Sequence, residues 1–109
     1  MKVILFKGTV PSLYKASPST LCDITNALLY KLADIPYGNP LRAEIRDHVS
    51  NISTATMILH RLGCPMDSET PWIQQPLHLD LITQDDAQHL EEASASLTWV
   101  RSNRNRVLD

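Results

Sequence analysis

The sequence is poor in the residues from which several common functional sites are built. It has 3 glycines, 2 cysteines, 2 tryptophans and 1 phenylalanine in 109 residues. Gly8, Gly38 and Gly63 lie far apart, so they cannot form a glycine-rich loop around a phosphate group. There is also no nucleophile elbow and no paired-carboxylate setting for acid–base catalysis. We therefore expect a protein that is not an enzyme and that uses no cofactor.

The two cysteines argue against both a disulfide scaffold and a metal centre. Cys22 and Cys64 form no CxxC pair, which favours two reduced, buried thiols. His60 and Cys64 are four positions apart, a spacing that can present two metal ligands from a helix. Structural zinc requires four ligands in short-range pairs, and this is the only such pair in the chain. We therefore expect no metal site.

Long apolar segments are also missing. The run "VILF" after Lys2 is too short for the core of a signal peptide, and no stretch of about 18 consecutive apolar residues occurs. These features predict a cytoplasmic protein without membrane contact. With 43% apolar residues, the chain can form one compact domain over residues 1–109.

Charge is divided unevenly along the chain. Residues 1–64 have a formal charge of +3, whereas residues 65–109 have a charge of −5. The segment 65–92 contains seven acidic residues and neither lysine nor arginine. Three arginines follow it near the end of the chain. The two halves are therefore expected to attract different partners.

Periodicity and capping residues predict four helices and two strands. "KVILFKGTV" indicates a strand over residues 2–7, within an N-terminal segment 1–10. A helix is expected to begin after Ser17 or Ser19, and a second to run from Pro40 to about Val49. After a turn at "SNIS", a third helix capped by Ser53 ends near Gly63.

Two further elements follow in the acidic half. "LHLDLI" alternates leucine with polar residues, which is typical of a half-buried strand. A C-terminal helix over residues 84–106 has its acids in the first turns and its arginines in the last. Its apolar stripe predicts a homodimer through residues 85–100. Together these elements predict an α+β fold, with a three-helix core, a small β-sheet and a C-terminal helix.

The order of elements over residues 17–82 resembles the winged helix-turn-helix superfamily of small bacterial and phage-type regulators. The resemblance rests on "PLRAEIRDHV", the short turn, "ISTATMILHRLG" and the strand-like tail. The turn has one residue more between its apolar anchors than the tight DNA-binding version. The resemblance implies a winged-helix-like core whose third helix enters the major groove of double-stranded DNA.

Under this interpretation, the polar face of the third helix and two preceding arginines contact DNA. Arginine can bind guanine through two hydrogen bonds, and threonine or methionine can touch a thymine methyl group. The predicted DNA-binding residues are Thr54, Thr56, Met57, His60, Arg61, Arg42 and Arg46.

A second hypothesis belongs to another class of function. The acidic segment would repel the DNA backbone that a wing normally contacts, so the domain could instead dock on a basic protein. Under this hypothesis, the chain itself would be an accessory or inhibitory protein of a mobile element. Large aromatic residues often anchor interfaces of this kind. The predicted protein-interaction residues are Trp72, Asp85, Asp86, Glu91 and Glu92.

Overall fold

The computed structural model describes residues 15–74 and 78–108. Over these residues the fold is entirely helical, which corrects the expected α+β fold with its small sheet. The predicted N-terminal strand, residues 2–7, lies outside the described residues. The elements are α2 (Pro18–Ala33), α3 (Pro40–Arg61), the short 3₁₀ helices η2 (Trp72–Gln74) and η3 (Leu79–Leu81), α4 (Gln84–Ser102) and α5 (Arg104–Val107).

α2 begins and ends where local signals predict. The Ser17 hydroxyl accepts a hydrogen bond from the backbone N–H of Thr20 at 3.1 Å, and Pro18 occupies the first turn. Leu21 and Leu28 are fully buried, so the predicted apolar stripe faces the core. The helix expected after Ser17 is therefore confirmed.

α3 is one continuous helix of 22 residues, which corrects the predicted turn at "SNIS". Asn39 caps it by accepting a hydrogen bond from the Leu41 N–H at 3.0 Å. Between Leu41 and Arg61 there is no glycine or proline to stop a helix. Ile45 and Ile52 are both fully buried seven positions apart, so one apolar stripe continues through the expected turn. The second and third predicted helices are thus two halves of α3.

Over residues 78–82, the leucine alternation does not produce the predicted strand, and Leu77 lies outside the described residues. Residues Leu79–Leu81 form a 3₁₀ turn, in which the Leu81 N–H donates to the His78 carbonyl at 3.1 Å. The His78 N–H donates to the Leu62 carbonyl at the end of α3, at 2.9 Å. Thr83 then caps α4, which begins at the next residue. These backbone groups are satisfied without a neighbouring strand.

α4 packs its apolar stripe against α3 within the same chain. Leu90, Ala93 and Leu97 are fully buried, and Val100 is 1% exposed. The homodimer prediction requires that part of this stripe be left uncovered by the rest of the domain. Since the chain covers it, the stripe is not a surface for a second copy, and the homodimer stays a prediction without an identified interface.

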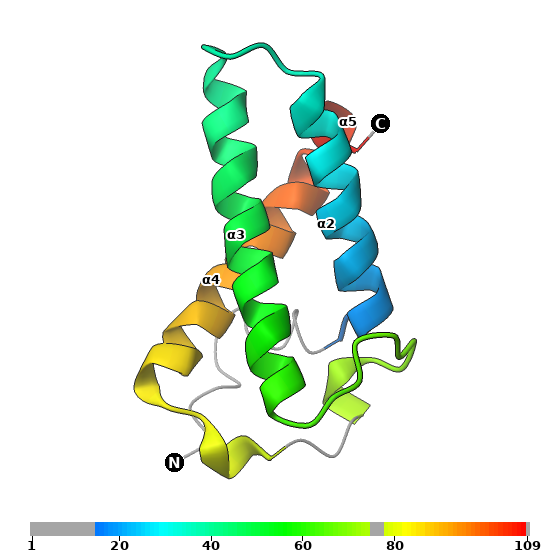
Figure 1. The fold of residues 1–109 in the computed structure, drawn as a ribbon, viewed down its shortest axis with the longest axis vertical. Helices are drawn as coiled ribbons and strands as arrows, with labels where there is room; N and C mark the ends of the chain where they lie inside the picture. The colour runs from blue at the N-terminus through cyan, green and yellow to red at the C-terminus, as the bar shows by residue number, and fades with distance from the viewer. Residues whose placement is uncertain (1–14, 75–77, 109) are drawn as a thin grey trace.

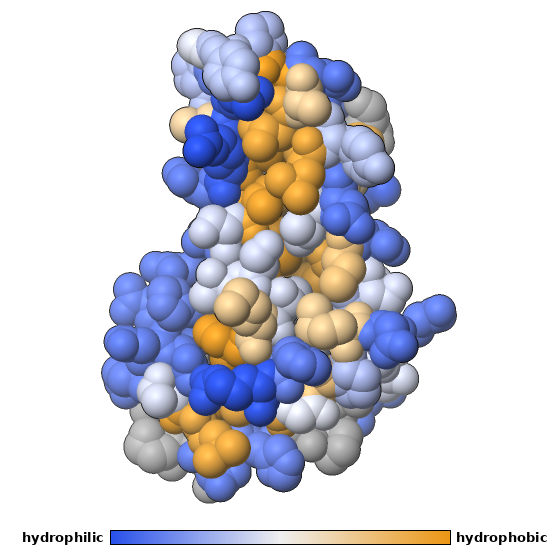
Figure 2. Space-filling model, in the orientation of Figure 1, coloured by the Kyte–Doolittle hydropathy of each residue, from blue (hydrophilic) through white to orange (hydrophobic). Residues whose placement is uncertain are grey.

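The helices are arranged as a hairpin crossed by a third helix. α2 and α3 lie side by side in opposite directions, and α4 runs obliquely behind them (Figure 1). The molecule is elongated, with extents of 43 × 25 × 20 Å. On the face away from α4, apolar side chains gather between α2 and α3 in the upper half of the view (Figure 2).

Candidate functional site

The residues predicted to contact DNA extend along the whole of α3. Arg42 lies in its first turn and Arg61 is its last residue. At 1.5 Å per residue, their backbones are about 28 Å apart along the helix axis. The set therefore does not occupy the short, separate recognition helix that the sequence indicated.

Arg42 fastens the turn between α2 and α3. Its Nη1 donates hydrogen bonds to the carbonyl oxygens of Leu32 and Ile35, at 2.7 and 2.8 Å. The guanidinium carbon lies 4.1 Å from the ring centroid of Tyr37, a cation–π contact. Carbonyl groups at the C-terminal end of a helix need a donor from outside it. Arg42 supplies such a donor, so its guanidinium group is occupied by contacts within the fold.

Arg61 joins the end of α3 to the start of α4. Its Nη2 pairs with Oδ2 of Asp86, and the same oxygen accepts a hydrogen bond from the Thr83 N–H at 3.2 Å. Burial alone would raise the pKa of Asp86. The hydrogen bonds from Thr83 and the charge of Arg61 outweigh it and hold the pKa below its ordinary value of 3.8. Asp86 is therefore ionised near neutral pH, and its carboxylate joins the end of α3 to the start of α4.

The other predicted DNA-binding residues divide between the core and the surface. Thr56 is only 8% exposed, and its hydroxyl donates to the Ser53 carbonyl at 2.7 Å. Thr54 is half-buried. The members of the set that are exposed and hold no structural contact to another element are Arg46, Met57 and His60.

The spacing of His60 and Cys64 does not create a metal site. His60 directs Nδ1 toward the backbone carbonyl oxygen of Cys64, at 3.2 Å, rather than toward the sulfur. Burial raises the pKa of the Cys64 thiol to about 11, so the thiol is protonated at neutral pH and is a poor ligand or nucleophile. Within residues 15–74 and 78–108, no group of three or more histidine, cysteine, aspartate or glutamate residues is placed to hold a metal ion.

The N-terminal half of α4 presents carboxylates to solvent. Asp85, Glu91 and Glu92 are exposed, and we call these three residues the acidic face. Asp85 and Glu92 are seven positions apart, which places them on the same side of the helix two turns apart. His89 lies beside this side, with Nδ1 3.4 Å from Oε1 of Glu92. The Asp86 side chain is only 14% exposed and contacts Arg61 and Thr83, whereas the other three predicted acidic interaction residues are exposed.

Trp72 belongs to the core rather than to an interface. Its side chain is fully buried, and its backbone N–H donates to the Ala16 carbonyl at 3.0 Å. This contact holds the loop after α3 against the start of α2. Trp72 is therefore not at the surface beside the acidic residues, where an aromatic anchor was expected.

A polar cluster between α3 and α4 was not evident from the sequence. His48 Nδ1 lies 2.7 Å from the Ser96 hydroxyl, which also accepts a hydrogen bond from Asn51 Nδ2 at 3.0 Å. The His48 ring stacks on Trp99, with 4.2 Å between ring centroids. Burial lowers the pKa of His48 below its ordinary value of 6.5, although Glu44 and Asp47 oppose this shift. The partners are 48 positions apart, so no local spacing could reveal them.

Comparison with protein-family models, with curated proteins and with solved structures found no match to the chain. Within the described residues, none of the helices has the length and apolar character needed to cross a membrane.

Proposed function

We propose that this chain is a non-enzymatic protein-interaction domain that docks through the acidic face of α4 on a basic surface of a partner protein. The observation that carries the proposal is the exposure of Asp85, Glu91 and Glu92 in a segment without lysine or arginine. A surface of one sign steers a partner of opposite sign and selects against partners of like sign.

The alternative, DNA binding through α3, has less support. Arg42 caps α2, Arg61 pairs with Asp86, and Thr56 is buried, so the polar face lacks its strongest phosphate and base contacts. An acidic face close to the end of the same helix would also repel phosphate groups. Recognition of double-stranded DNA by α3 therefore stays a secondary prediction.

We further propose that the domain acts in the cytoplasm. Cys22 and Cys64 are both free, and Cys64 is buried beside the end of α3. Unpaired, buried thiols are usual in a reducing compartment.

The test is capture of partners by the purified, immobilised chain from an extract of cells that express it. We would compare wild type with the triple variant Asp85→Asn, Glu91→Gln and Glu92→Gln, leaving Asp86 in place because it stabilises α4. The expected result is a defined protein that is retained by wild type, released by rising salt and retained several-fold less by the variant.

A charge-matched control separates the acidic face from the overall charge of the chain. Asp23→Asn, Glu44→Gln and Asp47→Asn remove the same number of exposed carboxylates from α2 and α3. This variant should retain the partner as wild type does. Equal loss in both variants, or no salt-sensitive partner at all, would refute docking through α4.

A further inference from the structure

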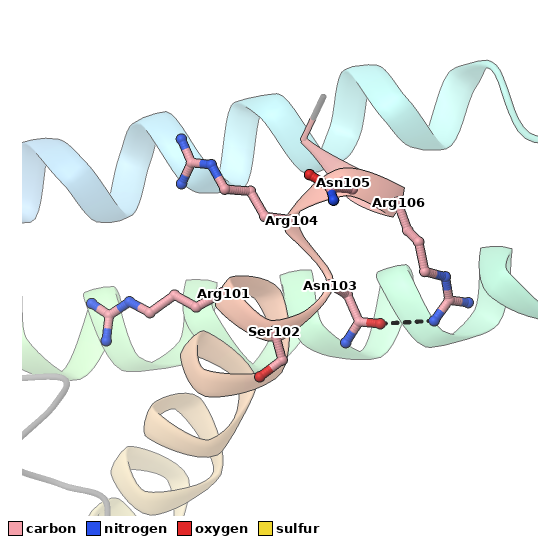
Figure 3. Close-up of a pocket in the computed structure, with 6 residues that line it drawn as sticks. All are labelled: Arg101, Ser102, Asn103, Arg104, Asn105 and Arg106. Atoms are coloured by element: carbon pink, nitrogen blue, oxygen red, sulfur yellow. Dashed lines mark hydrogen bonds between the residues drawn. The ribbon is translucent and has the colours of Figure 1, made fainter.

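The C-terminal end of α4 carries a cluster of arginines that the proposed docking surface does not use. Residues 101–106 read "RSNRNR", so half of this segment is arginine and the rest is serine and asparagine. The six residues together line a shallow pocket, which Figure 3 shows in close-up. We call this segment the arginine elbow.

The elbow is held in a fixed conformation by contacts on both sides. Asn103 ends α4, and its Nδ2 donates to the Trp99 carbonyl at 2.8 Å. Its Oδ1 accepts a hydrogen bond from Arg106 Nη1 at 2.7 Å (Figure 3). Val107 is fully buried and secures α5 against the core. The arginines therefore extend from an ordered backbone, which lowers the entropy lost when they bind.

Two of the three guanidinium groups have no protein partner in the part of the chain that the structure describes. Arg101 and Arg104 are exposed and form neither an ion pair nor a hydrogen bond there. Arg42 and Arg61, by contrast, are both engaged by the fold. Because their guanidinium groups pair with no other side chain within the described residues, Arg101 and Arg104 are available to an anionic ligand.

The acidic face does not neutralise the elbow. The nearest member of the acidic face, Glu92, is nine positions from Arg101 on α4, about 14 Å along the helix axis. The Debye length at physiological ionic strength is about 8 Å. The two surfaces therefore act independently, and a ligand of the elbow differs from a partner of the acidic face.

The direction of the side chains indicates the form of the ligand. Arg101 and Arg104 extend to one side of the elbow and Arg106 to the other (Figure 3). They do not converge on one point, as they would around a single phosphate ion. Divergent guanidinium groups suit a chain of successive phosphates, each able to accept two parallel hydrogen bonds from one arginine. Serine and asparagine side chains also bind phosphate and sugar oxygens.

We infer that the arginine elbow binds the sugar–phosphate backbone of a nucleic acid, without reading its sequence. A domain with this site and the acidic face could contact a basic nucleic-acid-binding protein and the nucleic acid next to it. The inference does not depend on the proposed docking function, because the residues and the test are different.

The test is fluorescence anisotropy of the full chain with labelled nucleic acids, starting at 50 mM salt. The probes are a 20-nucleotide oligo(dT) and a 20-base-pair duplex of random sequence, with polyglutamate and inorganic phosphate as competitors. We expect binding to both nucleic acids. For the duplex, the logarithm of the binding constant should fall by about 2 to 3 for each ten-fold rise in salt concentration, as for three phosphate contacts. Polyglutamate and phosphate should compete at least ten-fold more weakly than unlabelled oligonucleotide.

Matched variants locate the site. Arg101→Gln with Arg104→Gln and Arg106→Gln should weaken binding about ten-fold and abolish most of the salt dependence. The double variant Arg101→Gln and Arg104→Gln keeps the bond between Arg106 and Asn103, so it tests the site even if the triple variant is unstable. Lys15→Gln with Lys31→Gln removes two positive charges elsewhere, as many as the double variant, and should leave binding nearly unchanged.

Three results would overturn the inference. The first is no salt-sensitive binding of either nucleic acid by wild type. The second is an equal loss in the elbow variants and in the control, which would indicate diffuse attraction. The third is binding of polyglutamate that matches oligonucleotide and depends on the same arginines, which would make the elbow a surface for an acidic protein instead.

Discussion

The arginine side chains of this protein differ in what their guanidinium groups contact. Arg42 binds the carbonyl oxygens at the end of α2, and Arg61 binds Asp86 at the start of α4. Arg101 and Arg104 contact no charged group within the described residues. The same residue type is thus structural at two positions and available to ligands at others.

The structural role of Arg42 leads to a prediction about stability. Arg42→Ala removes the hydrogen bonds to Leu32 in α2 and to Ile35 in the turn after it, and also the contact with Tyr37, so the free energy of unfolding should fall by about 1.5–3 kcal/mol. Arg46→Ala, one turn further along α3 and exposed, should change it by less than about 0.5 kcal/mol. Urea denaturation of the two variants provides the comparison. Equal effects would mean that Arg42 does not fasten the turn.

The lowered pKa of His48 predicts that the stability of the protein depends on pH. The pKa of His48 is lowered in the folded chain, chiefly by burial, so the unfolded chain takes up the proton first as pH falls. The stabilisation is therefore complete above pH 6.5, the ordinary value, and is lost as pH falls through the lower folded pKa. Protonation would place a charge between α3 and α4, beside Ser96 and Trp99.

We expect the free energy of unfolding of wild type to decrease from pH 7 to pH 5. His48→Gln can still hydrogen-bond Ser96 but does not titrate, so its stability should change much less over the same interval. Urea denaturation at several pH values measures both. A wild-type curve as flat as that of the variant would show that His48 is not the group responsible. The lowered pKa of Asp86 acts below pH 3.8 and does not overlap with this interval.

At the level of elements, the continuity of α3 distinguishes this domain from a helix-turn-helix. A helix-turn-helix needs a break near Ser50, whereas the observed helix continues through it. Both central residues of the expected turn lie within α3. Ile52 is fully buried in the core, and Asn51 donates a hydrogen bond to Ser96 on α4. The continuity of α3 removes the separate recognition helix.

Substitutions at Ser50, which is exposed, distinguish a helix from a turn. In a helix interior, Ser50→Ala should stabilise the protein by a few tenths of a kcal/mol, and Ser50→Gly should destabilise it by about 0.5 kcal/mol. A turn would favour glycine instead. Thermal and urea unfolding should rank the proteins as alanine, serine, glycine. The reverse order would contradict a continuous α3.

The sequence predicted the elements that local signals specify. α2 and α4 begin at capping residues and follow apolar stripes, and both could be located from the residues themselves. The turn at "SNIS" was predicted from residues that also suit a cap, but buried Ile52 favoured a longer helix. The alternation at residues 77–82 was too short to distinguish a strand from a 3₁₀ turn, because the difference depends on whether a partner strand is present.

The acidic character of the candidate site could be predicted from the sequence, but the structural roles of several of its residues could not. The absence of basic residues from the segment 65–92 was evident in the sequence, and exposure of Asp85, Glu91 and Glu92 agrees with it. The roles of Arg42, Asp86 and Trp72 depend on contacts between distant segments. No spacing rule indicates such contacts, and all three were assigned to binding surfaces.

At the level of the whole molecule, α4 separates opposite charges. Its first turns carry the acidic face and its last turn leads into the arginine elbow. This order complements the helix dipole, so it helps α4 form while it places charge at the two ends. The elongated shape keeps these ends apart, and we propose that each contacts a different macromolecule.

The most direct measurement is carbodiimide cross-linking of the captured partner, which joins a carboxylate to a lysine amine in contact with it. Mass spectrometry then identifies the cross-linked residues on this chain. We predict that the cross-links fall on Asp85, Glu91 and Glu92, and that they disappear as salt is raised. Cross-links confined to Asp23, Glu44 or Asp47, or none with a partner that is still bound, would contradict docking through the acidic face.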